Sequence, residues 1–252
     1  GQLGIIGSAT SPDSSTQSSS QSTDKADGGH SSNGAGTDNA NGTGGVGGTD
    51  GADGNGQDTV TDNPLKIVES GWSADQQGYV HYAFALRNTS TTQQVQYPQI
   101  TITGRAKDGS IVFSQTQTLN MAFPNQTVYD AGQAGEGTAP ATVDFVVLSP
   151  DTYNVTEAQG TATFPISGTS KIDNRDGGTT FNGEVRAVAD GFKPSDGQQI
   201  KISLVLRNAQ NAIIYGDIAF VDWPGNGRSA PFSITVYDLP KYVSYDLYAQ
   251  IW

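Results

Sequence analysis

A β-hairpin is indicated by Ile202-Ser-Leu-Val-Leu-Arg-Asn-Ala-Gln-Asn-Ala-Ile-Ile-Tyr-Gly-Asp-Ile-Ala-Phe220, in which two apolar segments flank a polar turn. A weakly similar pattern occurs earlier, in Ile100-Thr-Ile-Thr-Gly-Arg-Ala-Lys-Asp-Gly-Ser-Ile-Val-Phe-Ser-Gln-Thr116. Two copies of one hairpin predict two related β-domains. The aligned pairs are Ile102 with Leu204, Arg105 with Arg207, Lys107–Gly109 with Ala209–Asn211, and Ile111–Phe113 with Ile213–Tyr215.

Apolar side chains recur at every second position on both sides of these hairpins, as in half-buried strands. No apolar period of 3.6 residues persists for three turns, so helix is expected to be minor. One long loop is expected at residues 123–140, with room for a helical turn. Beyond the hairpins, Val143 and Phe145 are expected to correspond to Phe232 and Ile234. Strands are expected near residues 65–72, 80–86, 95–103, 111–119, 143–147, 162–166, 181–188, 200–207, 213–220, 232–236 and 243–251.

Aromatic residues divide the chain, because none occurs before Trp72. Residues 1–63 are rich in Ser, Thr, Gly, Asn and Asp and cannot offset a backbone ordering cost of roughly 1–2 kcal/mol per residue. We therefore expect a disordered linker at 1–63, a β-sandwich at 64–168, a polar connector at 169–178 and a second sandwich at 179–252. The predicted fold class is all-β, with two tandem immunoglobulin-like antiparallel β-sandwich domains after a disordered N-terminal linker.

Charge and cysteine content exclude several classes of function. The formal net charge is −12, so a nucleic-acid partner is not expected. No run of Lys or Arg is present to hold the chain on a membrane surface. Cysteine is absent, which excludes disulfides, thiol catalysis and cysteine-based metal sites. With the polar leader, this composition fits an extracytoplasmic bacterial protein, and we expect any membrane attachment to lie upstream of Gly1.

The hairpin and its flanks suggest a family. Arg87-Asn-Thr-Ser90, then Val95, Ile100-Thr-Ile102 and Lys107-Asp-Gly-Ser-Ile-Val112 resemble the FxLYD domain, and residues 202–215 are similar in the second copy. The resemblance implies two tandem copies of a bacterial extracytoplasmic immunoglobulin-like module. Such modules are typical of lipoproteins and membrane-anchored surface proteins, often without an assigned biochemical activity. The resemblance therefore implies a fold and a location rather than a reaction.

Catalytic side chains are scarce. The only histidines are His30 and His81, and His81 is expected to be a solvated residue on the outer face of its strand. A Ser-His-acid triad needs a histidine held by a neighbouring acid, so this mechanism is not expected. The few Glu residues form no pair within an aromatic cluster of the kind that glycoside hydrolysis needs. The chain is predicted not to be an enzyme, and no catalytic residue is assigned.

Calcium is the one cofactor with a sequence-based alternative. Asp173-Asn-Arg-Asp-Gly177 places Asp173 and Asp176 between the expected domains, where a cation could stiffen the junction. Arg175 occupies the third position, and the acidic residue that closes an EF-hand loop is missing. The stretch at 50–58 alternates acidic side chains with glycine in a similar way. An ordinary polar turn is the competing interpretation, and no cofactor is assigned.

An aromatic loop gives the second functional hypothesis. Asp222-Trp-Pro-Gly-Asn-Gly-Arg228 contains Trp223, Asn226 and Arg228, which together could bind a carbohydrate or the cell wall. The competing interpretation is that Trp223 covers the edge of a hydrophobic core. The favoured function is a non-enzymatic structural or interaction protein of the bacterial cell surface, with two domains on a flexible tether. About 60 flexible residues have a reach of roughly 40–45 Å. The expected partner is an unidentified protein or glycan of the cell envelope.

Overall fold

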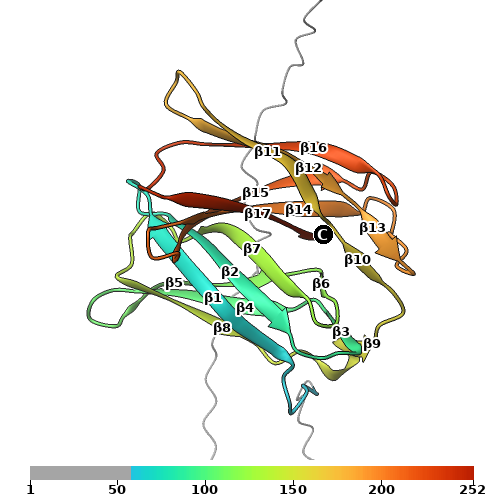
Figure 1. The fold of residues 1–252 in the computed structure, drawn as a ribbon. Coiled ribbons are helices and arrows are strands. Elements are labelled where there is room, and N and C mark those ends of the chain that lie inside the picture. The colour runs from blue at the N-terminus through green and yellow to red at the C-terminus, as the bar shows by residue number, and fades with distance from the viewer. Residues whose placement is uncertain (1–57) are drawn as a thin grey trace, which may run out of the picture. The chain divides into compact units, whose positions relative to one another are not determined.

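The sheets are small and antiparallel in the computed structural model, which describes residues 58–252 (Figure 1). A fold built from β-strands is thus confirmed. The earlier strands are β1 (Leu65–Ala74), β2 (Val80–Asn88), β3 (Gln93–Gln96), β4 (Gln99–Arg105), β5 (Ile111–Thr118), β6 (Met121–Ala122), β7 (Thr127–Ala134), β8 (Thr142–Val147) and β9 (Val155–Glu157), with a 3₁₀ turn at Thr152–Asn154. The later strands are β10 (Thr161–Thr163), β11 (Ile166–Asp173), β12 (Thr179–Arg186), β13 (Val188–Asp190), β14 (Gln199–Arg207), β15 (Ile213–Asp222), β16 (Ser229–Val236) and β17 (Ser244–Ile251).

The same topology occurs twice. In the first half the strand orders are β1-β2-β7 and β5-β4-β8, and in the second half they are β11-β12-β16 and β15-β14-β17. The hairpin alignment is confirmed in detail, because Arg105 pairs with Ile111 and Arg207 pairs with Ile213. A register shift precedes each arginine at the same place. Both copies of the hairpin therefore carry the same irregularity next to the turn.

The predicted alignment beyond the hairpins was wrong. Val143 and Phe145 lie on β8, which pairs with the hairpin strand β4, whereas Phe232 and Ile234 lie on β16, which pairs with β12. By pairing, β8 corresponds to β17, and β16 corresponds to β7. Strand β7 falls inside the segment that was expected to be a loop. Asp130, Gly132 and Gln133 interrupt its apolar pattern, although the backbone pairs with β2 throughout.

Apolar side chains gather in two main clusters, one formed by the first half and one formed mostly by the second half, to which Met121 and Phe123 of the first half also belong. The first cluster includes Phe84 and Ile102, and the second includes Phe181 and Leu204, all fully buried. Burying a side chain of this size contributes about 1.5–3 kcal/mol. A third, small cluster joins strands of the two halves and is formed by Ala83, Ala131, Val205 and Ile213. Residues 58–252 accordingly lie within one compact unit.

The packing of residues 162–166 differs from what was expected. Ala162 and Phe164 were assigned to the first sandwich, but they pack in the second cluster, and β10 pairs with β13. The expected connector at 169–178 is part of the hairpin formed by β11 and β12. Sequence patterning missed β11 because nearly all of its side chains are exposed, so no apolar alternation marks it. Backbone pairing with β12 holds it in the sheet.

The expected linker also ends earlier. Residues 1–57 lie outside the described part of the chain. Within 58–63, Thr59 forms a β-bridge with Asp151, and the Val60 amide donates to the Pro150 carbonyl over 3.1 Å. Thr59 and Val60 are therefore bound to the loop that precedes the 3₁₀ turn. Within residues 58–252, none of the helical segments has the length and apolar character needed to cross a membrane.

Candidate functional site

Two sheets of different halves face each other, β1-β2-β7 and β15-β14-β17. In Figure 1, β7 and β17 lie next to one another where the two halves meet. Glycines allow the close approach, because a Cβ atom at Gly216 would collide with the backbone of Tyr82. A Cβ atom at Gly71 would collide with Ile213 in the same way. The backbones of the two sheets therefore approach each other closely at these glycines. As a result, β2 is buried on both faces rather than one.

An arginine from the second hairpin spans this interface. The Arg207 side chain is 6 % exposed and forms a two-pronged ion pair with Glu69 of β1, one arm of which is 3.1 Å long. Its Nε atom donates to Asp246 over 2.8 Å. The hydrogen bond from Arg207 holds the pKa of Glu69 below its usual value, although partial burial opposes this. A planar guanidinium matched to a carboxylate makes this contact strong and directional.

Two tyrosines continue the interface beside the arginine. The rings of Tyr129 and Tyr248 stack with centroids 3.7 Å apart and planes 7° apart. The Tyr129 hydroxyl donates to Glu69 over 3.0 Å. Burial and the neighbouring Tyr248 raise the pKa of Tyr129 above its usual value, so its hydroxyl remains a donor at neutral pH. Glu69 thus accepts hydrogen bonds from both sheets.

A buried ion pair lies deeper in the interface. The Lys201 ammonium on β14 is 2.8 Å from Oδ1 of Asp130 on β7, and the two side chains are 2 % and 0 % exposed. The Gln250 side-chain amide donates to the same Asp130 oxygen over 2.8 Å. Lys201 also lies over the ring of Trp252, 4.1 Å from its centroid. Isolated charges are costly to bury, so each depends on the other.

Three buried polar atoms at this interface have no hydrogen-bond partner in the described part of the chain. They are Oδ2 of Asp130, Oε1 of Gln250 and the hydroxyl of Ser203. Ser203 follows Lys201 by two residues and so lies on the same face of β14. A fully satisfied interior leaves few such atoms. The set of unpartnered atoms marks the Lys201–Asp130 pair as unusual.

His81 is not the solvated surface residue that was expected. Its side chain is 16 % exposed, its Nε2 atom is 2.8 Å from Asp75, and its ring stacks on Tyr215 of the second half with centroids 4.8 Å apart. Burial opposes ionisation of Asp75, but the hydrogen bonds from His81 and the Tyr79 amide lower its pKa. A cavity of about 100 Å³ adjoins this pair. Ser73 is the cross-strand neighbour of His81, yet no side-chain hydrogen bond joins them within 58–252.

The predicted ligand site at Trp223 is only partly exposed. Trp223 packs against the second cluster, with its ring at 88° to Phe164 and the centroids 5.8 Å apart. The Asn226 side chain accepts from the Ala189 amide over 2.8 Å and donates back to its carbonyl. Arg228 is exposed, and its carbonyl accepts from the Ala187 amide. Trp223 and Asn226 therefore hold the loop against β13 rather than forming an open aromatic platform.

The calcium alternative placed Asp173 and Asp176 at a domain junction, and this placement was wrong, because both lie at the β11–β12 hairpin turn. Both oxygens of Asp176 are engaged, one by the Gly178 amide and the other by the Tyr237 hydroxyl. These bonds lower the pKa of Asp176. Asp173 accepts from Thr179 and lies 3.9 Å from Lys171. Within residues 58–252 no three His, Asp or Glu side chains are grouped as metal ligands.

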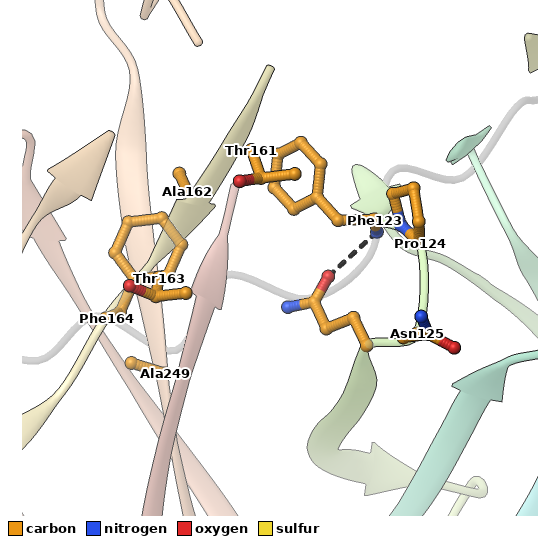
Figure 2. Close-up of a pocket in the computed structure, with 9 residues that line it drawn as sticks. Phe123, Pro124, Asn125, Thr161, Ala162, Thr163, Phe164 and Ala249 are labelled. Atoms are coloured by element: carbon orange, nitrogen blue, oxygen red, sulfur yellow. Dashed lines mark hydrogen bonds between the residues drawn. The ribbon is translucent and has the colours of Figure 1, made fainter. Parts of the chain in front are cut away.

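A groove of about 320 Å³ opens between the two halves (Figure 2). Phe123 and Pro124 line one side, from the turn between β6 and β7, whereas Phe164 and Ala249 belong to the second half. The Phe123 amide donates to the Gln126 side chain over 2.9 Å, which fixes the turn. Asn125 is exposed at the tip with a φ of 59°, a conformation that asparagine tolerates. The groove combines an apolar floor with amide and hydroxyl groups at its rim.

The sequence signals for these sites were uneven. Arg207 was aligned with Arg105 in the repeated hairpin, and no role was assigned to Lys201. Ile200 and Ile202 flank Lys201 in the alternation of an ordinary half-buried strand, so the sequence contains no signal that the face with Lys201 is also buried. No family model matches the chain, and no curated protein matches it either.

Proposed function

We propose that the two halves are tandem immunoglobulin-like β-sandwiches related to the FxLYD domain. The repeated strand orders support this proposal, since each half pairs a three-stranded sheet around β2 or β12 with another around β4 or β14. Sandwiches of the immunoglobulin kind distribute consecutive hairpins between two sheets in a similar way. The hairpin residues at 100–116 and 202–220 supply the sequence basis.

The function that fits this body best is a non-enzymatic structural or interaction protein of the bacterial cell surface. The observation that carries the proposal is the interface at Arg207 and Glu69, which makes one body of two repeats. A single stiff body suits display of a surface at a distance from an anchor. The polar N-terminal segment would act as the tether, and its composition is the basis for that role.

Surface digestion tests this proposal directly. Intact cells of the producing bacterium are treated with an external protease, and the chain is followed with an antibody to residues 58–252. We expect release of an intact folded fragment that begins near the end of the polar segment, while a cytoplasmic marker survives. Protection of the chain until the cells are lysed would contradict a surface location.

A glycan-binding role at the groove is the second candidate. The Phe123–Phe164 floor and the exposed Asn125 amide favour it, and the Trp223 ring packs edge-on against Phe164. This moves the hypothesis from the Trp223 loop to the neighbouring groove. The test is binding to an array of cell-wall glycans by the wild type and by Asn125→Asp, which keeps the turn but removes the amide donor. Equal binding by both proteins, or none by either, would argue against the groove.

A further inference from the structure

We propose that Lys201 and Asp130 condense to a side-chain amide, which joins the two halves of the molecule covalently. This inference is independent of the cell-surface role proposed above. The two residues lie on β14 and β7, strands of different halves. An amide between them would make a cross-link that needs neither cysteine nor metal. The chain contains no cysteine, so no disulfide could serve this purpose.

The distance between the groups favours the reaction. The Lys201 Nζ atom is 2.8 Å from Asp130 Oδ1. Since a carbon–oxygen bond is about 1.2 Å long, the nitrogen lies within about 4 Å of the carboxyl carbon. Reactive geometries place the two atoms about 3–3.5 Å apart. A displacement of less than about 1 Å would bring the amine nitrogen to this reactive distance from the carboxyl carbon. Groups held in this way react with effective concentrations of about 10⁵–10⁸ M.

The pair lies in largely apolar surroundings. Both side chains are almost fully buried, and Lys201 lies beside the rings of Trp252 and Phe220. Transfer of one proton from the ammonium to the carboxylate removes both buried charges and leaves an amine and a carboxylic acid. These are the two reactants of amide formation. Asp130 Oδ2 has no partner among the described residues, so no hydrogen bond holds that oxygen in place.

The chemical step is balanced without an oxidant or a co-reactant. The amine lone pair attacks Cγ of Asp130, a carbon–nitrogen bond forms, and negative charge develops on Oδ1. The Gln250 amide already donates to that oxygen over 2.8 Å and stabilises the developing charge. A proton then passes from nitrogen to Oδ2, the carbon–oxygen bond to Oδ2 breaks, and one water molecule leaves. The product is a neutral amide whose carbonyl oxygen keeps the Gln250 hydrogen bond.

Mass spectrometry of the purified full chain under denaturing conditions tests this proposal. We expect a mass lower than that of the sequence by one water molecule, about 18 Da. Trypsin should fail to cleave after Lys201, so fragments 108–171 and 187–207 should stay joined. Recovery of fragments 187–201 and 202–207 as separate linear peptides would overturn the proposal.

Two variants keep the result unambiguous. Lys201→Arg preserves a buried cation without a nucleophilic amine and should have the full sequence mass. Lys171→Arg changes an exposed lysine that also lies near an aspartate, and it should keep the loss of water. Cyclisation at Asp108-Gly109 would also release water, so a loss confined to fragment 108–171, with normal cleavage after Lys201, counts against the cross-link.

Discussion

The two hairpins of the repeat place the same arginine in different surroundings. Arg105 pairs with Asp144 across strands, and their side chains are 41 % and 53 % exposed. Arg207 pairs with Asp246 at the equivalent position, but it is 6 % exposed and also binds Glu69 of the other half. The sheet β15-β14-β17 is covered by the first half, whereas the outward side chains of β4 near Arg105 are half-buried. The same arginine ion pair therefore contributes more to stability in the copy where a second sheet excludes water from it.

We expect substitutions at residue 216 and at its counterpart to give the largest difference in stability between the two hairpins. Gly216 on β15 corresponds to Ser114 on β5, because they occupy matching register positions. Gly216→Ser would place a side chain against the backbone of Tyr82, so we expect destabilisation of about 3 kcal/mol, at the upper end for overpacking. The midpoint of urea unfolding measures the change. Ser114→Gly, the converse exchange at an exposed site, should cost about 0.5–1 kcal/mol, and equal costs would contradict the difference in burial.

Substitution of the two arginines should give the next largest difference in stability. Arg207→Ala leaves Glu69 and Asp246 without their cation, and because both acids keep partial solvent access, we expect a loss of about 2–3 kcal/mol. Arg105→Ala should cost less than about 1 kcal/mol, as exposed ion pairs do. Urea unfolding of the two variants gives both values. If Arg105→Ala proved as costly as Arg207→Ala, burial would not be the cause of the difference.

Lowering the pH should change stability through Glu69, and we expect this effect to be smaller than those of the arginine substitutions. The pKa of Glu69 is lowered in the folded chain, so its contribution is fully present above its usual pKa of 4.5 and is lost as the pH falls through the folded value. We expect Glu69→Gln to be less stable than the wild type at pH 7 and to lose less stability between pH 5 and pH 3. Unfolding temperatures across this range measure it. Parallel pH profiles would show that Glu69 is not responsible.

The smallest effect is expected at the β11–β12 turn. Asp176 is engaged by Gly178 and Tyr237, and among residues 58–252 it belongs to no group of three His, Asp or Glu side chains that could hold a cation. Calorimetric titration with Ca²⁺ at millimolar concentration should give no binding heat, and Asp176→Asn should give the same trace. Binding heat in the wild type that is absent in Asp176→Asn would support a calcium site at this turn.

Local pattern was enough to identify the two copies of the repeated hairpin. The Asp108-Gly109 turn needed only residues a few positions apart, and Gly109 has the positive φ of 86° that this turn requires. The arginines of the two copies were aligned correctly for the same reason. Strand β7 was missed because Asp130 and Gly132 interrupt its pattern. Their environment comes from strands distant in the chain, namely β14 and β2.

The sequence by itself determined the all-β character, the repeated hairpin and the position of the turn in its two copies, because each depends on alternation and turn chemistry within a short segment. Only the tertiary structure decided which repeat is covered, and hence that Lys201 is buried against Asp130 while Arg105 remains exposed. The physical reason is that burial of a charged side chain depends on a second sheet contributed by a remote segment. Alternation along one strand does not encode that partner.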